Sequence, residues 1–312
     1  MGDTNEQVSA WLDAANHHII DSDSGDMPDL LRQIPDPPTL LYAVGNMDAL
    51  HLPTLAVVGS RNPTRGGIQN AYEFSNHLAR SGFCIVSGLA QGIDTAAHQG
   101  ALDAGAKTVA FLGHGIDRVY PAENRELAHR IAEEGVLCSE YPLGSPPRRE
   151  HFPQRNRLIS GLSLGTLVVE AARRSGSLIS ARLAAEQGRE TFAIPGSIHN
   201  PLSRGCHQLI KQGAKLVECA EDIVSELGPL AGHLVQSAGI PTPGPAATAP
   251  HDADYESLLA TLSYDPASAD QLAEDSGLTI DQVSSMLLIL ELEGKIQVQA
   301  GGRYSRPQAS DH

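Results

Sequence analysis

The sequence predicts an α/β protein built on a wound parallel sheet with helices on both faces, followed by a small winged helix-turn-helix domain. Short apolar, β-branched segments alternate with amphipathic segments at a step of about 25 residues, which is the rhythm of repeated βαβ units. Glycines follow the amphipathic segments where helices should end. A stretch rich in proline, alanine and glycine then separates these repeats from a segment of different pattern.

Six segments are predicted strands because they are almost entirely apolar, as strands covered on both faces should be. They are residues 55–58, 83–87, 108–112, 136–140, 166–170 and 191–194. Three of the helices between them have clear ends, because glycine favours the left-handed C-cap that terminates a helix. These helices are 71–80 before Gly82, 94–104 before Gly105, and 178–187 before Gly188.

Composition shifts divide the chain into four predicted parts. They are a lead-in over 1–50 that packs on the sheet, the main α/β domain over 51–230, a linker over 231–251, and a winged helix-turn-helix over 252–308. The last part is assigned from three helices closed by a small hairpin. Its helices are 255–262, 269–275 and 280–293, and its strands are 295–299 and 303–305.

Length and composition limit the class of protein. A chain of 312 residues with 41% hydrophobic content is long enough for one large packed domain and a small one. Its apolar runs are far shorter than the roughly 20 residues that cross a bilayer, and the N-terminus lacks the pattern of a secretory signal, so we expect a cytoplasmic protein. The four cysteines are widely spaced and are expected to be buried, reduced thiols: Cys84, Cys138, Cys206 and Cys219.

The charge of −15 is concentrated at the two ends of the chain. Residues 1–60 hold one basic and nine acidic side chains, residues 61–230 hold eighteen and seventeen, and residues 231–312 hold three and eleven. Six arginines cluster in the near-neutral middle, at positions 148, 149, 155, 157, 173 and 174. The planar guanidinium suits phosphate, so the cluster favours a phosphate-bearing ligand. The alternative is a solvated loop whose arginines pair with surface carboxylates.

Ligands in open α/β sheets bind beyond the carboxyl ends of the strands, and four loops there are rich in small residues. In the first, Gly59 lets backbone approach a ligand, Ser60 offers a hydroxyl and Arg61 supplies charge. The helix that follows should present unpaired N–H groups to an anion.

The second loop carries Gly88 and Gly92, followed by Asp94 and His98 one helical turn apart. The simplest interpretation makes Asp94 an acid at a helix N-terminus and His98 a packed histidine, with direct ligand contact as the alternative.

The third loop contains Gly113, and Lys107 precedes its strand. The fourth loop is the arginine run, which leads to Asn156, Arg157 and, after the next strand, Ser177. Four such loops at one sheet edge predict a groove.

Several classes of function find no support in the sequence. There is no Gly-x-Gly-x-x-Gly, no Walker loop, no Gly-x-Ser-x-Gly elbow between a predicted strand and a helix, and no metal-binding cluster, so we expect a binding protein that is not an enzyme and uses no cofactor or metal.

Five motifs in order closely resemble the DNA-processing protein A family, also called Smf. They are residues 59–61, 87–98, 120–124, 152–161 and 175–178, and the resemblance covers roughly residues 30–226. It implies an extended Rossmann-like domain that binds single-stranded DNA, forms homodimers and loads the RecA recombinase during natural transformation. Many family members also carry a helical domain before the lead-in, for which about 50 residues leave no room beside the lead-in itself.

The resemblance also implies site residues. Ser60 and Arg61 match the family's leading phosphate-binding loop, and Asn156, Arg157 and Ser160 match its arginine-asparagine-arginine segment. The full predicted DNA-binding set is Gly59, Ser60, Arg61, Gly88, Gly92, Lys107, Gly113, Arg155, Asn156, Arg157, Ser160 and Ser177. Residues His207, Leu209 and Leu216 are candidates for the dimer contact, with ordinary packing on the sheet as the alternative.

Arg61 and Arg157 are expected to neutralise successive phosphates while the bases point outward or stack loosely, so sequence preference should be small. Tyr120, Tyr141 and Phe152 are the few aromatic residues expected near the groove. The winged helix is acidic and should repel phosphates, which favours a protein-contact or vestigial role.

Two alternative functions remain open. One is a nucleotide phosphoribohydrolase-like enzyme, although the stretch from Gly161 to Glu170 lacks that group's glycine pair and places the acid one residue late. The other is a sensor of small nucleotides that signals through the winged helix.

Overall fold

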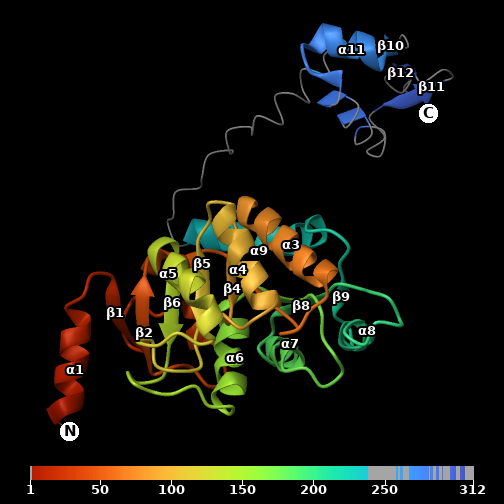
Figure 1. Cartoon of the computed structure of the whole chain (residues 1–312). Helices are drawn as coiled ribbons and strands as arrows, with labels where there is room; N and C mark the ends of the chain where they lie inside the picture. Colours follow the sequence, from red (N-terminus) through yellow and green to blue (C-terminus); the bar gives the residue numbers. More distant parts are fainter. Residues whose placement is uncertain are drawn as a thin grey trace. The chain divides into compact units, whose positions relative to one another are not determined.

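A computed structural model describes residues 2–237, 258, 261–262, 267–280, 282–283, 286–287, 290, 296–299 and 303–305 (Figure 1). The chain divides into two compact units, Met1–Ile240 and Pro241–His312, which are treated separately below. Among the described residues, no helix has the length and apolar character needed to cross a membrane.

The first unit is organised around a nine-stranded sheet in the order β1-β2-β6-β5-β4-β3-β7-β8-β9. Its strands are β1 His17–Asp21, β2 Leu40–Gly45, β3 Thr54–Val58, β4 Cys84–Ser87, β5 Thr108–Phe111, β6 Val136–Ser139, β7 Gly165–Val168, β8 Glu190–Ala193 and β9 Lys215–Leu216. The strands from β3 to β9 are parallel to their neighbours, whereas β2 runs antiparallel to both β6 and β1. The chain therefore winds from β3 toward β6 in one direction and from β7 toward β9 in the other.

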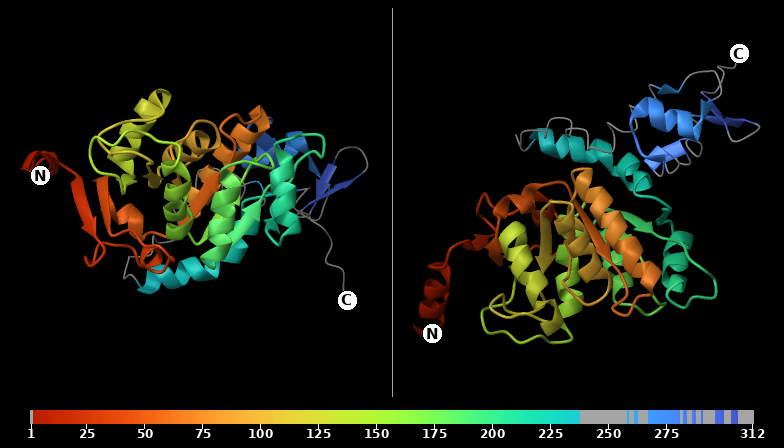
Figure 2. Two further views of the ribbon diagram at one scale, coloured as in Figure 1. Left: turned by 90° about the horizontal axis from the view of Figure 1, so that it is seen from below. Right: turned by 45° about the horizontal axis from the view of Figure 1, so that its top comes forward.

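Helices cover both faces of this sheet (Figures 1 and 2). One face packs against α2 Asp29–Arg32, η1 Met47–His51, α6 His151–Leu162, α7 Ser177–Glu186 and α8 Ser203–Lys211. The other packs against α3 Arg65–Arg80, α4 Ile93–Asp103, α5 Arg125–Glu134 and α9 Glu221–Ser237. The helix α1 Gly2–Leu12 contacts the β1–β2 edge through Trp11, and η2 Ala122–Asn124 leads into α5.

Burial on both faces explains the continuous apolar strands. In β3, Ala56 and Val58 belong to one core, and Leu55 and Val57 belong to the other, all at most 4% exposed. Because side chains alternate along a strand, a central strand between two helical layers has no polar face to offer solvent.

The predicted α/β class, the six predicted strands and the glycine helix ends are confirmed. Each predicted strand agrees with β3 to β8 to within two residues at either end. Gly82, Gly105 and Gly188 all have positive φ, at 92°, 73° and 69°, as glycine caps beyond a helix C-terminus require.

Residues 1–50 do more than pack on the sheet. They add β1 and β2 as an antiparallel pair beside β6, with register from Tyr42 opposite Ser139 to Gly45 opposite Val136. The extension ends the parallel arrangement on that side, because β2 arrives without the crossover helix that a parallel neighbour needs.

Two sequence-based expectations change. Helix α9 continues through Ser237, so residues 231–237 of the predicted linker are helical, and the rest of that linker lies outside the described residues. Cys84, Cys138 and Cys206 are buried free thiols, but Cys219 is exposed, because it lies in the short turn between β9 and α9.

The second unit contains α11 Ala269–Ser276 and a three-stranded sheet of β10 Ala267–Ser268, β12 Arg303–Ser305 and β11 Gln297–Gln299. A reciprocal cap between Ser268 and Gln271 starts α11, and Gly277 with φ 72° ends it. The helix predicted over 269–275 and the strand predicted over 303–305 are confirmed. Much of the predicted helices 255–262 and 280–293 lies outside the described residues.

Candidate functional site

A pocket with a cavity volume of about 770 Å³ lies beyond the carboxyl ends of β3 and β7. This is the place where the winding direction of the sheet reverses, because β4 lies on one side of β3 and β7 on the other. Loops after the two strands must separate there, and the crevice between them is the usual ligand site of open α/β sheets. Three segments form the walls: Gly59–Arg61, the first turns of α6, and the loop from Arg174 to Ser177.

The pocket is strongly cationic. Arg61, Arg149, Arg155 and Arg174 line it, whereas the acidic lining residue is the buried Asp94. Of the six clustered arginines, Arg157 forms ion pairs, while Arg148, Arg149, Arg155, Arg173 and Arg174 have none within 4.0 Å in the described part of the chain. The alternative of a loop neutralised by surface carboxylates therefore fails for five of the six.

Arg155 is a charge placed beneath the pocket. Its side chain is only 3% exposed, and its Nη1 donates a hydrogen bond to the carbonyl of Phe111 at the end of β5. Burial lowers the pKa of Arg155 to about 10, while Asp94 favours the charged form, so the guanidinium stays protonated at neutral pH. Its Nε is buried and has no partner among the described groups.

Gly88 makes room for this guanidinium. A Cβ at position 88 would collide with Nη1 of Arg155 and would lie 2.5 Å from its Cζ. The glycine predicted to admit a ligand therefore admits a neighbouring side chain instead. The sequence alone could not reveal this, because the two residues are 67 positions apart.

Asp94 braces the second loop from within, and Gly92 lets that loop approach the first. Asp94 Oδ2 accepts hydrogen bonds from the backbone N–H groups of Gly88 and Ala90, at 3.1 and 3.3 Å. Gly92 has φ +84°, and a Cβ there would lie 2.5 Å from the carbonyl oxygen of Ser60, which accepts from Ile93 N. Burial raises the pKa of Asp94, and Arg155 opposes the shift.

His98 is a packed histidine, as the simpler interpretation expected. It is fully buried, and burial lowers its pKa to about 3. The Thr108 hydroxyl donates to Ile85 O, so the 2.8 Å contact between His98 Nδ1 and Thr108 Oγ1 makes Nδ1 the donor.

The N-terminus of α3 is already occupied, contrary to expectation. Thr64 Oγ1 accepts from Gly67 N, and the carboxylate of Glu170 accepts from Thr64 N and Thr64 Oγ1 at 2.9 and 2.7 Å. A carboxylate from the end of β7 thus takes the place predicted for a ligand anion. Gly59, which precedes this loop, packs against the Ile93 side chain.

The N-terminus of α7 borders the pocket, which Ser175, Gly176 and Ser177 line. Its first N–H groups already have partners, because Ser177 N donates to Ser175 Oγ at 3.3 Å, and Leu178 N and Ile179 N donate to the carbonyls of Ser175 and Gly176. The positive end of the helix dipole still favours an anion in the pocket.

One wall of the pocket is aromatic. The Arg61 guanidinium lies over the Phe152 ring, 5.1 Å from its centroid, and Tyr120 lies 6.0 Å from the same ring. Gly113 packs beneath Phe152, where a Cβ would lie 3.2 Å from the ring. Tyr141 stacks on His151 beside the pocket and does not line it.

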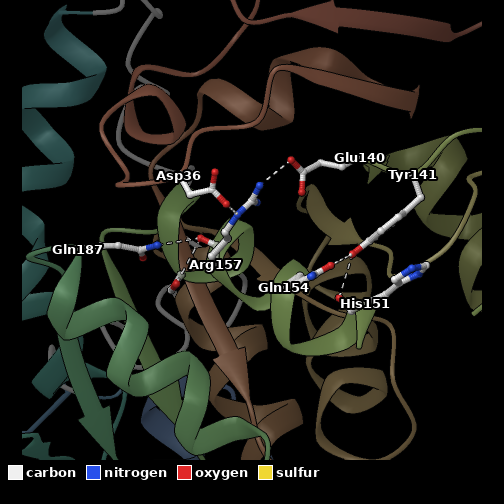
Figure 3. Close-up of polar contacts among 8 residues, drawn as sticks. Asp36, Glu140, Tyr141, His151, Gln154, Arg157 and Gln187 are labelled. Atoms are coloured by element: carbon white, nitrogen blue, oxygen red, sulfur yellow. Dashed lines mark hydrogen bonds and ion pairs between the residues drawn. The ribbon is translucent and has the colours of Figure 1, made fainter. Parts of the chain in front are cut away.

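Arg157 does not line the pocket, contrary to prediction. Its Nε contacts Asp36 Oδ2 at 2.9 Å, and its Nη2 contacts Glu140 Oε1 at 2.7 Å (Figure 3). Its carbonyl accepts from Gln187 Nε2. Arg157 therefore ties the lead-in and the end of β6 to α6, one residue after Asn156, which does line the pocket.

Two more predicted residues lie away from the pocket. Lys107 precedes β5 at the amino edge of the sheet, the edge opposite the pocket, and pairs with Asp48 at 3.3 Å. Ser160 is buried within α6, and its hydroxyl donates to helix carbonyls one turn back. Strand direction places Lys107 away from the pocket, and helix phase places Ser160 away from it.

The residues predicted for a dimer contact occupy different environments. Leu209 is 9% exposed and packs in the core beneath α8, which makes it a poor surface contact. His207 Nε2 lies 2.9 Å from the carbonyl oxygen of Gly196. Leu216 is 43% exposed on β9, at the end of the sheet order.

Arg174, Ser175 and Gly176 are pocket residues that the predicted set omitted. The signal was present, since Arg174 belongs to the arginine cluster and the three residues follow a predicted strand. Their proximity to the β3 loop depends on strand order, which a single sequence does not give.

Comparisons with known proteins give matches in both parts of the chain. Residues 18–228 match the family model of DNA recombination-mediator protein A, and residues 242–302 match the DprA winged helix domain. Protein Smf of Escherichia coli is 43% identical over 98% of this chain and 82% of its own length. The DNA processing protein DprA of Streptococcus pneumoniae is 48% identical over 63% of this chain and 69% of its own.

Two solved structures resemble this one. The X-ray structure of DNA processing protein A from Streptococcus pneumoniae aligns with a TM-score of 0.67 and 43% identity, covering 71% of this chain and 77% of that one. DNA processing protein A from Helicobacter pylori, described by its single-stranded DNA binding mode, aligns with a TM-score of 0.62 and 30% identity, covering 68% and 96%.

We predict that Arg157→Met lowers the free energy of unfolding by about 1–3 kcal/mol, because Glu140, whose side chain is 19% exposed, loses its partner. Asp36→Asn is the matched control. Its carboxylate is 82% exposed, so its loss should cost at most about 1 kcal/mol. Denaturant unfolding of both variants measures the difference, and equal midpoints would contradict the structural role of Arg157.

Proposed function

The chain belongs to the DNA recombination-mediator protein A family, and from this we propose that its cationic pocket binds single-stranded DNA through the phosphate backbone. The observation that carries the proposal is the group of arginines without carboxylate partners at the switch point of the sheet, next to the N-terminus of α7. The guanidinium groups and the positive end of the helix dipole both stabilise anions, and they act on the same cavity.

The pocket residues would contribute to binding a strand in different ways. Arg61 and Arg174 are exposed and can form direct contacts with phosphate oxygens. Arg155 lies below them as a fixed positive charge. Its guanidinium is already buried in the folded protein, so ligand binding removes little further water from it. The positive end of the α7 dipole adds to the field of these arginines. None of these groups reads a base edge, so the proposal includes little sequence preference.

Tyr120 and Phe152 give the pocket a limited surface for stacking. Phe152 already has Arg61 over its ring, and Tyr120 is 48% exposed. One or two stacked bases at ~1–3 kcal/mol each would add to the backbone contacts. The aromatic residues would then contribute more to the binding free energy than the sequence suggested, although the arginines would still contribute most of it.

The acid that the hydrolase alternative would need is already engaged in hydrogen bonds within the protein. Glu170, the counterpart considered for general acid/base work, is 7% exposed and accepts two hydrogen bonds from Thr64. In the described part of the chain, no group of three His, Cys, Asp or Glu side chains is placed to hold a metal. Family membership supports the proposal of a binding protein that is not an enzyme and that acts in the cytoplasm.

We predict that fluorescence anisotropy will show salt-sensitive binding of a labelled oligothymidine, with weaker binding of duplex DNA. If about four phosphates are neutralised, the slope of log K against log salt should be about −3, at roughly −0.7 per phosphate. Arg61→Ala should weaken binding about 10- to 100-fold. Arg80→Ala is the matched control, since Arg80 is an exposed arginine at the C-terminal end of α3.

The possible outcomes separate the functions. Equal losses in the two variants would indicate a general charge effect and not a site. Saturable binding of mononucleotides with no gain for longer oligonucleotides would support the nucleotide-sensor alternative.

We also propose that the bound strand is passed to the RecA recombinase, as a mediator of recombination during natural transformation would require. The support is family membership. Single-stranded DNA covered by a single-strand-binding protein should support faster RecA-dependent ATP hydrolysis when this protein is added. Arg61→Ala should remove most of that stimulation, and an unchanged lag with wild type would contradict the mediator role.

We propose that two copies pair through the β9 edge. Leu216 is exposed there, and β9 ends the strand order of the described sheet. An unpaired edge strand is a ready surface for association. Sedimentation at micromolar concentration should give a dimer for wild type and a monomer for Leu216→Asp. A wild-type monomer would refute the pairing.

A further inference from the structure

The loop from Gly88 to Gly92, which joins β4 to α4, contains a strained residue. Leu89 has φ 57°, in the left-handed region that leucine rarely adopts, and among the described residues other than glycine only Asn16 shares it. The Leu89 side chain is 1% exposed and packs in a core with Leu112. Strained backbone persists where the surrounding groups hold it, and it is common at ligand sites. The groups that hold this loop are therefore candidates for a role in the pocket.

Asn124 holds two consecutive carbonyl groups of the loop, one directly and one through Thr95. Asn124 Nδ2 donates to the carbonyl of Leu89 and to Thr95 Oγ1, at 2.9 Å in each case. The Thr95 hydroxyl in turn donates to the carbonyl of Ala90 at 2.9 Å. Asn124 is 5% exposed, so water cannot readily replace these hydrogen bonds. Both N–H groups of one side-chain amide are thus used to fix the loop.

Asn124 also belongs to the segment that carries part of the aromatic wall. It ends η2, four residues after Tyr120, and Tyr120 lines the pocket together with Ala90. A smaller hollow beside the pocket is lined by Ala90 and Gln91 on one side and by Tyr120 and Pro121 on the other. The position of Tyr120 relative to Ala90 therefore depends on the hydrogen bonds of Asn124.

We propose that Asn124 is a positioning residue for the cationic pocket: its amide sets the spacing between the Gly88–Gly92 loop and Tyr120 and so keeps the pocket in the shape that binds a DNA strand. This rests on the proposed function and adds a residue that does not itself line the pocket. Asp94 has a separate part, because its Oδ2 accepts from loop N–H groups and leaves the loop carbonyls to Asn124. A residue that only stabilised the fold would not act through Tyr120.

The first measurement compares Asn124→Leu with the matched control Asn76→Leu, using fluorescence anisotropy of a labelled oligothymidine. Leucine has nearly the shape of asparagine but no N–H to donate, and it adds no charge. The affinity of Asn124→Leu should fall about tenfold, since an apparent affinity falls with the fraction of molecules whose site is correctly formed. Asn76 makes the same kind of bond away from the pocket, to the carbonyl of Gly100 at 3.0 Å, so its loss should leave DNA binding unchanged.

The second measurement repeats the comparison in a Tyr120→Ala background. Tyr120→Ala keeps the arginines of the pocket, so binding remains measurable. If Asn124 acts by placing the loop against Tyr120, Asn124→Leu should weaken binding less than about threefold in this background, because the effects of coupled residues do not add. An effect on the fold alone would give the same factor with and without Tyr120.

The outcomes separate the inference from the function on which it rests. If wild type does not bind the oligothymidine, the proposed function fails together with the inference. If wild type binds, the function stands, and the inference is overturned when Asn124→Leu binds as tightly as Asn76→Leu or loses the same factor in both backgrounds. Thermal unfolding shows whether each variant is folded, and Asn124→Ala with Asn76→Ala replaces the first pair if Asn124→Leu is unfolded.

Discussion

The reversal of strand order between β3 and β7 is the constraint on which the rest of the site depends. Because β4 and β7 lie on opposite sides of β3, the loops that follow β3 and β7 diverge and leave a crevice between them. The cationic side chains of the pocket are arranged around that crevice. Arg61 comes from one loop, Arg174 and the start of α7 from the other, and α6 supplies Arg155 from below. An acidic chain can therefore present a strongly positive surface, because its net charge says little about one place on it.

Local patterns were sufficient to predict much of the fold. Strands covered on two faces have few polar residues, and glycines with positive φ end helices, so β3 to β8 and the ends of α3, α4 and α7 could be read directly. The first 50 residues were harder. Strand β2 is held by antiparallel pairing with β6, and β1 pairs in turn with β2. The β2–β6 pairing brings together residues about a hundred positions apart, such as Tyr42 and Ser139.

The location of the site could be predicted from the sequence, but the side chains that line it could be predicted only in part. Strand direction alone separates Lys107 from the pocket, and helix phase alone turns Ser160 away from it. Arg155 and Arg157 are two positions apart in α6, yet one lies under the pocket and the other pairs with Asp36 and Glu140. Residue type cannot distinguish a phosphate-binding arginine from one that pairs with a carboxylate, because the same planar guanidinium group makes both contacts.

The fit between Gly88 and Arg155 has a consequence for how such proteins diverge. Any side chain at position 88 would occupy the space of the guanidinium, and a shorter residue at position 155 would leave a hole beside Gly88 and an unanswered carbonyl at Phe111. Neither position can drift alone without loss of stability, so the two should be inherited as a pair. In relatives that have a smaller residue at position 155, residues larger than glycine should be tolerated at position 88, and the composition of that loop could change.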